Sequence, residues 1–308
     1  MSHLSNPLAT TSQLYAQSAS NPSALPLEIQ DSIRFYTARL TQAAGILLRM
    51  PQDITAQANV LLFRYWAVDR LMEWEFSDVS AATLYLTAKI SASPRSLRSI
   101  TNVYAFLLSP SSPLSSSPTS APPKDDPASY YLSESAYITY RTRLLLIEGQ
   151  ILNAIGFTTH VALPHSLAIT YLQTLDIFTS PKTGSRVAKR AIAWLNTALL
   201  SPQMLYLTHQ PCALATAAVY LACREEGVRL PEVEWWEVFD CEREELGFLV
   251  VGMGSLERVA RREIERWGLG KGMITREDVE ASVGVKAEEE DEETMMARML
   301  DEKVKEEV

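Results

Sequence analysis

The stretch Ala81-Ala82-Thr83-Leu84-Tyr85-Leu86-Thr87-Ala88-Lys89 returns 135 positions later as Thr216-Ala217-Ala218-Val219-Tyr220-Leu221-Ala222-Cys223-Arg224. Both stretches are Ala-rich, helix-forming and end in a basic residue. A spacing of this length exceeds the roughly 20 to 50 residues of a solenoid unit and is typical of a duplicated domain. The pair therefore predicts two copies of one helical bundle. In the first copy the small side chains favour a central helix, because they let neighbouring helices approach closely.

The segments around the first Ala-rich stretch also indicate helices. Apolar residues recur at three and four positions, while glycine and proline fall between segments. We expect helices over 26–47, from 53 to about 76, and over 133–155, the last one ending at Gly156. Five helices are expected in the first half, and the predicted fold class is all-α with two tandem five-helix repeats.

Length and composition support a division into two cores. The chain has 308 residues, of which 47% are hydrophobic, enough for two ordinary domains. We expect a disordered N-terminus over 1–24, a first repeat over 25–159 and a second repeat over 160–270. An acidic tail over 271–308 is expected to be mostly disordered.

A Ser/Pro-rich segment interrupts the first repeat. Residues 109–127 contain six prolines and seven serines, a composition that cannot continue a helix. We expect a loop insertion here. Ser109, Ser112 and Ser117 each precede a proline, which makes them candidate sites for a proline-directed kinase. A surface loop with no regulatory role explains the same composition.

The charge distribution argues against a strongly basic nucleic-acid groove. The net charge is −9, and the ten acidic and four basic residues from Lys286 onward contribute −6, which leaves about −3 for the rest. We therefore expect no direct nucleic-acid partner. No apolar run approaches the roughly 20 residues that span a bilayer, and residues 1–21 lack a signal-peptide core. A membrane role is not expected, and the expected location is the cytosol or nucleus.

Motifs for catalysis, metals or cofactors do not emerge. Cys212, Cys223 and Cys241 are too widely spaced for a zinc knuckle and are interpreted as buried free thiols. The four histidines show no metal-binding spacing. Gly252-Met253-Gly254 lacks the third glycine and the βαβ context of a dinucleotide site. The sequence therefore predicts a protein that is not an enzyme, with no metal and no cofactor.

Several stretches together resemble a known family. They are Gln42-Ala43-Ala44-Gly45-Ile46-Leu47-Leu48-Arg49-Met50-Pro51-Gln52, Phe63-Arg64-Tyr65-Trp66, Leu86-Thr87-Ala88-Lys89-Ile90, Tyr171-Leu172-Gln173, Gln210-Pro211, Tyr220-Leu221-Ala222 and Trp235. With the two all-α repeats, they resemble the cyclin fold of the transcriptional cyclins, and most closely the cyclin L branch. The resemblance covers roughly residues 25 to 267.

This resemblance implies a regulatory subunit that binds a cyclin-dependent kinase through the first repeat. The family's hallmark lysine and glutamate fall on Lys89 and Glu148. Ile90, Leu152 and Phe157 fall on positions that pack against the αC helix of the kinase. On spacing alone, Lys89 would simply end an exposed helix and Glu148 would be solvated. Both side chains are expected at the surface of the free protein.

The cyclin L branch implies a PITSLRE-type kinase partner, a role in RNA polymerase II transcription and pre-mRNA splicing, and a nuclear location. A cyclin of the K or C type, partnering a polymerase-tail kinase, is the alternative within the family. Ser91 and Ala92 replace the acidic residues usual after the lysine, which leaves open a scaffold that activates no kinase. The Arg/Ser-rich region of animal cyclin L is not found here, which weakens the expectation of a splicing role.

A TFIIB-like factor uses similar paired repeats to bind DNA. It would need an N-terminal zinc ribbon and a basic second repeat. No cysteine precedes Cys212, and the second repeat is acidic between Glu225 and Glu245.

Overall fold

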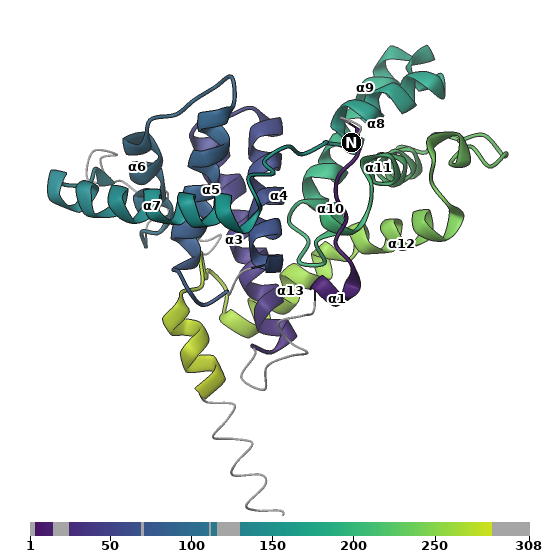
Figure 1. Ribbon diagram of the computed structural model, residues 1–308. Coiled ribbons are helices and arrows are strands. Elements are labelled where there is room, and N and C mark those ends of the chain that lie inside the picture. The colour runs from purple at the N-terminus through teal and green to yellow at the C-terminus, as the bar shows by residue number, and fades with distance from the viewer. Residues whose placement is uncertain (1–3, 15–24, 69–70, 111, 116–129, 285–308) are drawn as a thin grey trace, which may run out of the picture.

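The computed structural model describes residues 4–14, 25–68, 71–110, 112–115 and 130–284. Across these residues the regular structure is entirely helical, with no strand. Two groups of helices lie side by side, the first on the left of Figure 1 and the second on the right. The prediction of an all-α fold with two repeats is confirmed.

The first repeat is a bundle around α5, the first Ala-rich stretch. α5 packs against α3, α4, α6 and α7. Ala81, Ala82 and Ala88 are fully buried, so the small side chains do allow the close approach that a central helix needs. The five helices are α3 (Leu27–Leu47), α4 (Gln52–Val68), α5 (Phe76–Ile90), α6 (Leu97–Leu107) and α7 (Glu134–Ala154).

Gly45 explains how closely α3 and α4 approach each other. A Cβ atom at Gly45 would lie only 2.3 Å from Oγ1 of Thr55 and 2.7 Å from its Cγ2. Thr55 is itself buried in the first turns of α4. The glycine is therefore required by helix packing.

The second repeat is arranged around α11, the second Ala-rich stretch. α11 packs against α8, α9, α10 and α12. Residues Ala213 to Val219 are buried without interruption. The helices are α8 (His165–Thr174), α9 (Pro181–Ala198), α10 (Leu205–Thr208), α11 (Pro211–Glu225), α12 (Arg243–Gly254) and α13 (Leu256–Trp267), with 3₁₀ turns η2 (Ile177–Thr179) and η3 (Glu237–Phe239).

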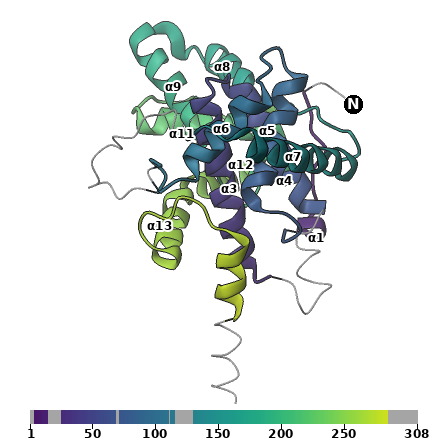
Figure 2. The same cartoon turned by 90° about the vertical axis from the view of Figure 1, so that its left-hand side faces the viewer.

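Helix α13 extends from the second group of helices to the first. Trp267 Nε1 donates a hydrogen bond of 3.1 Å to Oγ of Ser32 on α3. Arg266 forms an ion pair with Glu28, also on α3. In Figure 2 α13 lies beside the lower half of α3. Helix α13 thus connects the two repeats.

The stretch from Gln42 to Gln52, one of those that carry the family resemblance, lies at a second junction between the repeats. The side chains of Gln42 and Gln52 bond to each other, and Gln52 Nε2 donates to Oδ1 of Asn196 on α9 at 3.0 Å. Asn196 Oδ1 also lies 2.9 Å from Nε2 of His165, the first residue of α8. A polar network of side chains from four helices, α3, α4, α8 and α9, therefore joins the repeats where that stretch ends.

Gly252 and Gly254 belong to helix α12, so they form no phosphate-binding turn. Gly268 and Gly270 adopt positive φ angles of 90° and 93° directly after α13, as expected of glycines that end a helix.

Two predictions of disorder are wrong in part. Residues 4–14 were expected within a disordered N-terminus, but they hold buried polar and apolar side chains, Asn6 and Leu14. Residues 271–284 were assigned to the acidic tail, but Ile274 and Val279 are fully buried, and Arg39 donates to the carbonyl oxygens of Lys271 and Gly272. Both segments gain order from distant parts of the chain. Residues 285–308 lie outside the described residues.

The Ser/Pro-rich insertion is described only at its start. Ser109 is half-buried and donates a hydrogen bond of 2.7 Å to the carbonyl oxygen of Phe106. Ser112 is fully buried, so in this conformation its hydroxyl is not open to a kinase. Ser117 lies outside the described residues.

Candidate functional site

Lys89 and Glu148 lie together where α5 ends against α7. The Lys89 ammonium group forms an ion pair with Oε1 of Glu148. The Lys89 side chain is 50% exposed and also lies over the ring of Tyr85, 5.5 Å from its centroid. The Glu148 side chain is only 6% exposed. The expectation that both side chains lie at the surface is therefore wrong for Glu148, because the packing of α7 on α5 covers it.

Helix α7 has two apolar faces. Leu144, Ile147 and Ile151 are fully buried and point into the first repeat. On the outer side, Leu145, Gly149 and Leu152 follow one another at helical spacing, so they share a face. Leu145 is exposed, Leu152 is half-buried, and no atom lies within 4 Å of a Cβ placed at Gly149. This second face is apolar and open along Leu145 and Gly149, while Leu152 also packs partly against the core. We call Ile138, Leu145, Leu146, Gly149 and Leu152 the outer face of α7.

Phe157 extends this surface beyond the end of α7. Gly156 and Phe157 both have φ near +57°, and the Phe157 N–H donates to the carbonyl oxygen of Leu152 at 2.8 Å. A left-handed conformation is unfavourable for a residue other than glycine, by roughly 1 to 2 kcal/mol. The Phe157 ring is nevertheless 67% exposed. The backbone therefore holds an aromatic side chain out in solvent.

The five residues expected to bind a partner lie close together. Ile90 directly follows Lys89 and is half-exposed at the end of α5. Glu148 and Leu152 are one turn apart on α7, and Leu152 is bonded to Phe157 through the backbone. The structure thus joins an ion pair to an exposed apolar patch.

Sequence reasoning missed part of this surface. The missing part is Ile138, Leu145 and Leu146, which the family resemblance does not single out. All three are exposed. The signal was present in Leu144-Leu145-Leu146-Ile147, because four consecutive apolar residues on a helix cannot all face one core.

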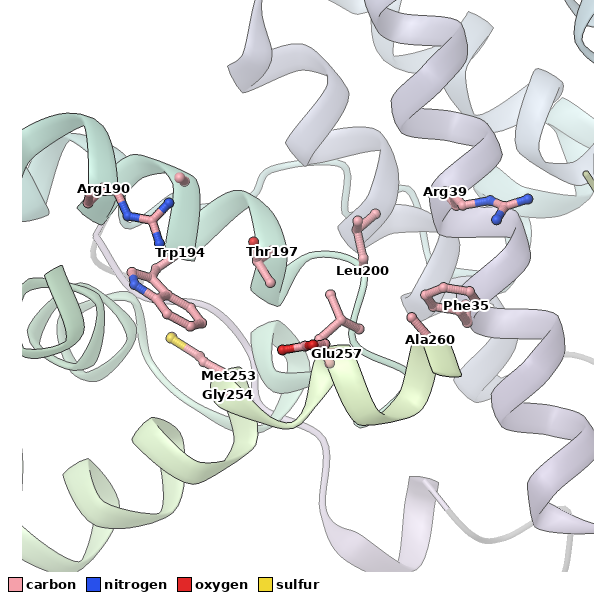
Figure 3. Close-up of a pocket in the computed structure, with 12 residues that line it drawn as sticks. Phe35, Arg39, Arg190, Trp194, Thr197, Leu200, Met253, Gly254, Glu257 and Ala260 are labelled. Carbon is pink, nitrogen blue, oxygen red and sulfur yellow. The ribbon is translucent and has the colours of Figure 1, made fainter. Parts of the chain in front are cut away.

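A second candidate site is a groove of about 380 Å³ between the two repeats. In Figure 3 Trp194 and Met253 lie on one side of it, and Phe35 and Ala260 lie on the other. Its charged lining residues have partners in the same chain. Arg39 bonds the backbone at Lys271, and two ion pairs are Arg190 with Glu225 and Glu257 with Arg261. The groove therefore offers apolar surface, and Arg39 is held by backbone carbonyl oxygens rather than by an ion pair among the described residues.

Metal binding finds no support in the described ranges. No group of three or more His, Cys, Asp or Glu residues there is placed to hold a metal ion. Cys223 and Cys241 are buried free thiols, whereas Cys212 is half-buried. Burial raises the pKa of Cys223 to about 11 and that of Cys241 to about 12, so both thiols stay protonated at neutral pH. None of the helices described is long and apolar enough to cross a bilayer.

Comparison with known proteins agrees with this geometry. No family model matches the chain. Human cyclin-L1 is 29% identical over 223 residues, which is 72% of this chain and 39% of that protein. Human cyclin-L2 is 27% identical over 244 residues, 79% of this chain and 43% of that protein. The chain thus spans about two fifths of the length of these curated relatives.

Solved structures share the fold. A chain of the yeast RNA polymerase II CTD kinase CTDK-1 complex superposes with a TM-score of 0.63 and 13% identity, covering 92% of this chain and 84% of that chain. A chain of the CAK complex from Chaetomium thermophilum gives a TM-score of 0.57 and 14% identity, with 92% and 91% covered. The molecule has the cyclin fold. Within that class its sequence is similar to cyclin L.

Proposed function

We propose that this chain is the regulatory subunit of a cyclin-dependent kinase, which it binds and activates through residues 25–159 while doing no catalysis itself. The partner we propose is a kinase of the PITSLRE type, acting in the nucleus in RNA polymerase II transcription and pre-mRNA splicing. The observation that carries the proposal is the exposed apolar outer face of α7 beside the Lys89–Glu148 pair. The similarity to cyclin L supports the choice of partner. Residues 160–270 form the second cyclin repeat in this proposal.

A kinase requires a specific position of its αC helix before its catalytic Lys–Glu pair forms and its activation loop is ordered. A protein that binds only the active αC position shifts the kinase population toward activity. The outer face of α7, Ile90 and Phe157 would supply the desolvated centre of such an interface. Half-exposed Lys89 would retain donor capacity for a kinase backbone carbonyl while holding Glu148, because an ammonium group has three donors.

The exposed aromatic ring makes Phe157 the best residue for a test. We expect Phe157→Ala to weaken kinase binding by about 2 kcal/mol, typical of an aromatic anchor. It should leave the melting temperature within about 2 °C, because the ring makes little contact in the free protein. Val238→Ala is a matched control, since Val238 is 74% exposed and lies in η3 of the second repeat.

The experiment is affinity purification of the tagged full chain from nuclear extract, followed by mass spectrometry and a kinase assay on the recovered complex. We expect an active PITSLRE-type kinase with the wild type and with Val238→Ala, and much less with Phe157→Ala. Equal recovery with all three proteins would rule out the proposed binding surface. Recovery of a bound kinase without activity would point to a scaffold.

A polymerase-tail kinase is the second candidate partner. It is favoured by the fold similarity to a chain of the yeast CTD kinase complex. The same purification separates the two candidates, because the recovered kinase is identified by its peptides. Phosphorylation of a polymerase-tail peptide by a complex that contains no PITSLRE-type kinase would reassign the partner and keep the binding surface.

A further inference from the structure

Residues 4–14 cross the junction between the repeats as an extended segment that ends in the short helix α1 (Thr11–Leu14). We call these residues the N-terminal strap. In Figure 1 the strap is the purple segment that runs down beside α10 and ends at α1. It touches the first repeat, the linker and the second repeat, although it was expected to be disordered.

Asn6 is the polar anchor of the strap. Its Nδ2 donates to the carbonyl oxygen of Ala162 at 2.8 Å, and its Oδ1 accepts from the N–H of Ala162 at 2.8 Å. Oδ1 also lies 3.4 Å from Nη2 of Arg64 on α4. Asn6 is only 6% exposed. One amide side chain therefore satisfies both backbone groups of a single linker residue, next to the first repeat.

The second repeat binds the backbone of the same residue. The Asn6 N–H donates to Oε1 of Gln210 at 3.0 Å, and Gln210 Nε2 donates to the carbonyl oxygen of Asn6 at 3.0 Å. Gln210 is the residue directly before α11. The two reciprocal pairs mean that the side chain of Asn6 is bound by the linker and its backbone by the second repeat.

The rest of the strap is held at two further points. The N–H of Ala9 donates to the carbonyl oxygen of Leu207 on α10 at 2.8 Å. Leu14 is buried, and α1 packs against α4. Pro7, Leu8 and Ala9 border a hollow of about 290 Å³, whose lining also includes Val68 and Ile155. The contacts combine hydrogen bonds with apolar burial, as in the binding of an extended peptide.

Arg64 shows that side chains of the first repeat hold the linker that the strap binds. Its guanidinium donates to the carbonyl oxygen of His160 at 2.8 Å as well as reaching Asn6. Gln57, two turns earlier on α4, donates to the carbonyl oxygen of Thr159 at 2.8 Å. The linker is thus fixed against α4 by side chains of the first repeat, and the strap adds to this contact.

We propose that the N-terminal strap is an intramolecular peptide ligand that clamps the two repeats, with Asn6 as its specificity residue. Ala162 presents one donor and one acceptor, and a primary amide matches both. An aspartate at position 6 would place a carboxylate oxygen against the carbonyl oxygen of Ala162, leaving that buried acceptor without a donor. The clamp fixes the orientation of the second repeat relative to the first and does not depend on the identity of any kinase.

The test is to cut the strap from the folded full chain. A protease recognition sequence is inserted between Gln17 and Ser18, the N-terminus carries a fluorophore, and the protein is cleaved after folding. We expect the cut strap to co-elute with the remaining chain in gel filtration. Asn6→Asp should speed its dissociation by about 10-fold or more, the effect of one unsatisfied buried polar group. Ser12→Ala is the control, because Ser12 is exposed and its hydroxyl bonds within the strap, to Thr10.

Two results would overturn the proposal. One is release of the wild-type strap at the same rate as Asn6→Asp, and the other is retention of the Asn6→Asp strap like the wild type. Gln210→Ala keeps the test informative if Asn6→Asp fails to fold, since it removes only the receptor contact to the Asn6 backbone. In the uncut chain, hydrogen exchange at the Ala162 amide should be at least about 10-fold faster in Asn6→Asp than in the Ser12→Ala control.

Discussion

Lys89 and Glu148 form an ion pair in which a half-exposed lysine neutralises a buried glutamate. The pair joins the last turn of the central helix α5 to the middle of α7, beside the exposed outer face of α7. It therefore contributes both to the packing of the first repeat and to the shape of the proposed binding surface.

Lys89→Ala should destabilise the first repeat. Removing one partner of a buried pair costs about 3 to 5 kcal/mol, and the exposure of Lys89 reduces the expected loss to about 1 to 3 kcal/mol. Urea unfolding measures the change. Arg98→Ala breaks an ion pair with Glu134 in which both side chains are exposed, so it should cost less than about 1 kcal/mol. Equal losses in the two variants would show that burial of Glu148 does not matter.

Gly149→Glu should block partner binding without harming the fold. A Cβ atom placed at Gly149 meets nothing within 4 Å among the described residues, and replacing a helical glycine gains up to about 1 kcal/mol of helix propensity. The carboxylate would stand in the centre of the apolar outer face of α7, where a partner would have to desolvate it. We expect an unchanged or higher melting temperature and loss of the co-purifying kinase. Gly149→Ala, which adds no charge, should retain the kinase.

Gly45→Ala should destabilise the first repeat, in contrast to the substitutions at Gly149. Its Cβ would meet Thr55 Oγ1 at 2.3 Å, and the resulting overpacking typically costs about 1 to 3 kcal/mol. This loss exceeds the gain in helix propensity. Thr55→Ala removes both clashing atoms, so the double variant should be more stable than Gly45→Ala alone. Additive losses in thermal unfolding would mean that the two helices adjust by another route.

Glu263 should make the junction between α13 and the first repeat sensitive to pH. Its side chain is fully buried, with Arg262 Nε 3.7 Å away, and burial raises its pKa above the ordinary value of 4.5. The folded state therefore binds the proton more tightly than the unfolded state. Stability from this group is present at acid pH and is lost as the pH rises from 4.5 through the raised pKa.

Glu263→Gln should consequently raise the melting temperature at pH 7.5, by the equivalent of about 1 to 2 kcal/mol. The gain should disappear below about pH 4.5, where the wild-type carboxyl is also neutral. Thermal unfolding at both pH values checks this, with Glu265→Gln as an exposed control on the same helix. A gain of the same size at both pH values would exclude titration of Glu263 as the cause.

Local sequence indicated the five helices of the first repeat and the central helix of the second. The Ala-rich stretches marked the two central helices because residue volume limits how closely helices approach, and this is a property of the residues themselves. Gly156 correctly marked the end of α7, since its φ of +57° suits glycine. The five residues of the proposed site came from the family resemblance, and the structure brings them together.

Only the tertiary structure decided which polar groups are buried and which segments are ordered. Glu148 is buried because α7 packs on α5. This packing brings Glu148 against Lys89, which lies 59 residues earlier in the chain. Asn6 is ordered by hydrogen bonds to Ala162 and Gln210, which lie 156 and 204 residues away along the chain. Residues 271–284 are ordered by contacts with α3. Such contacts leave no local periodicity in the sequence, and composition alone predicted disorder at both termini. Both segments are ordered because folding brings distant hydrogen-bond partners to them.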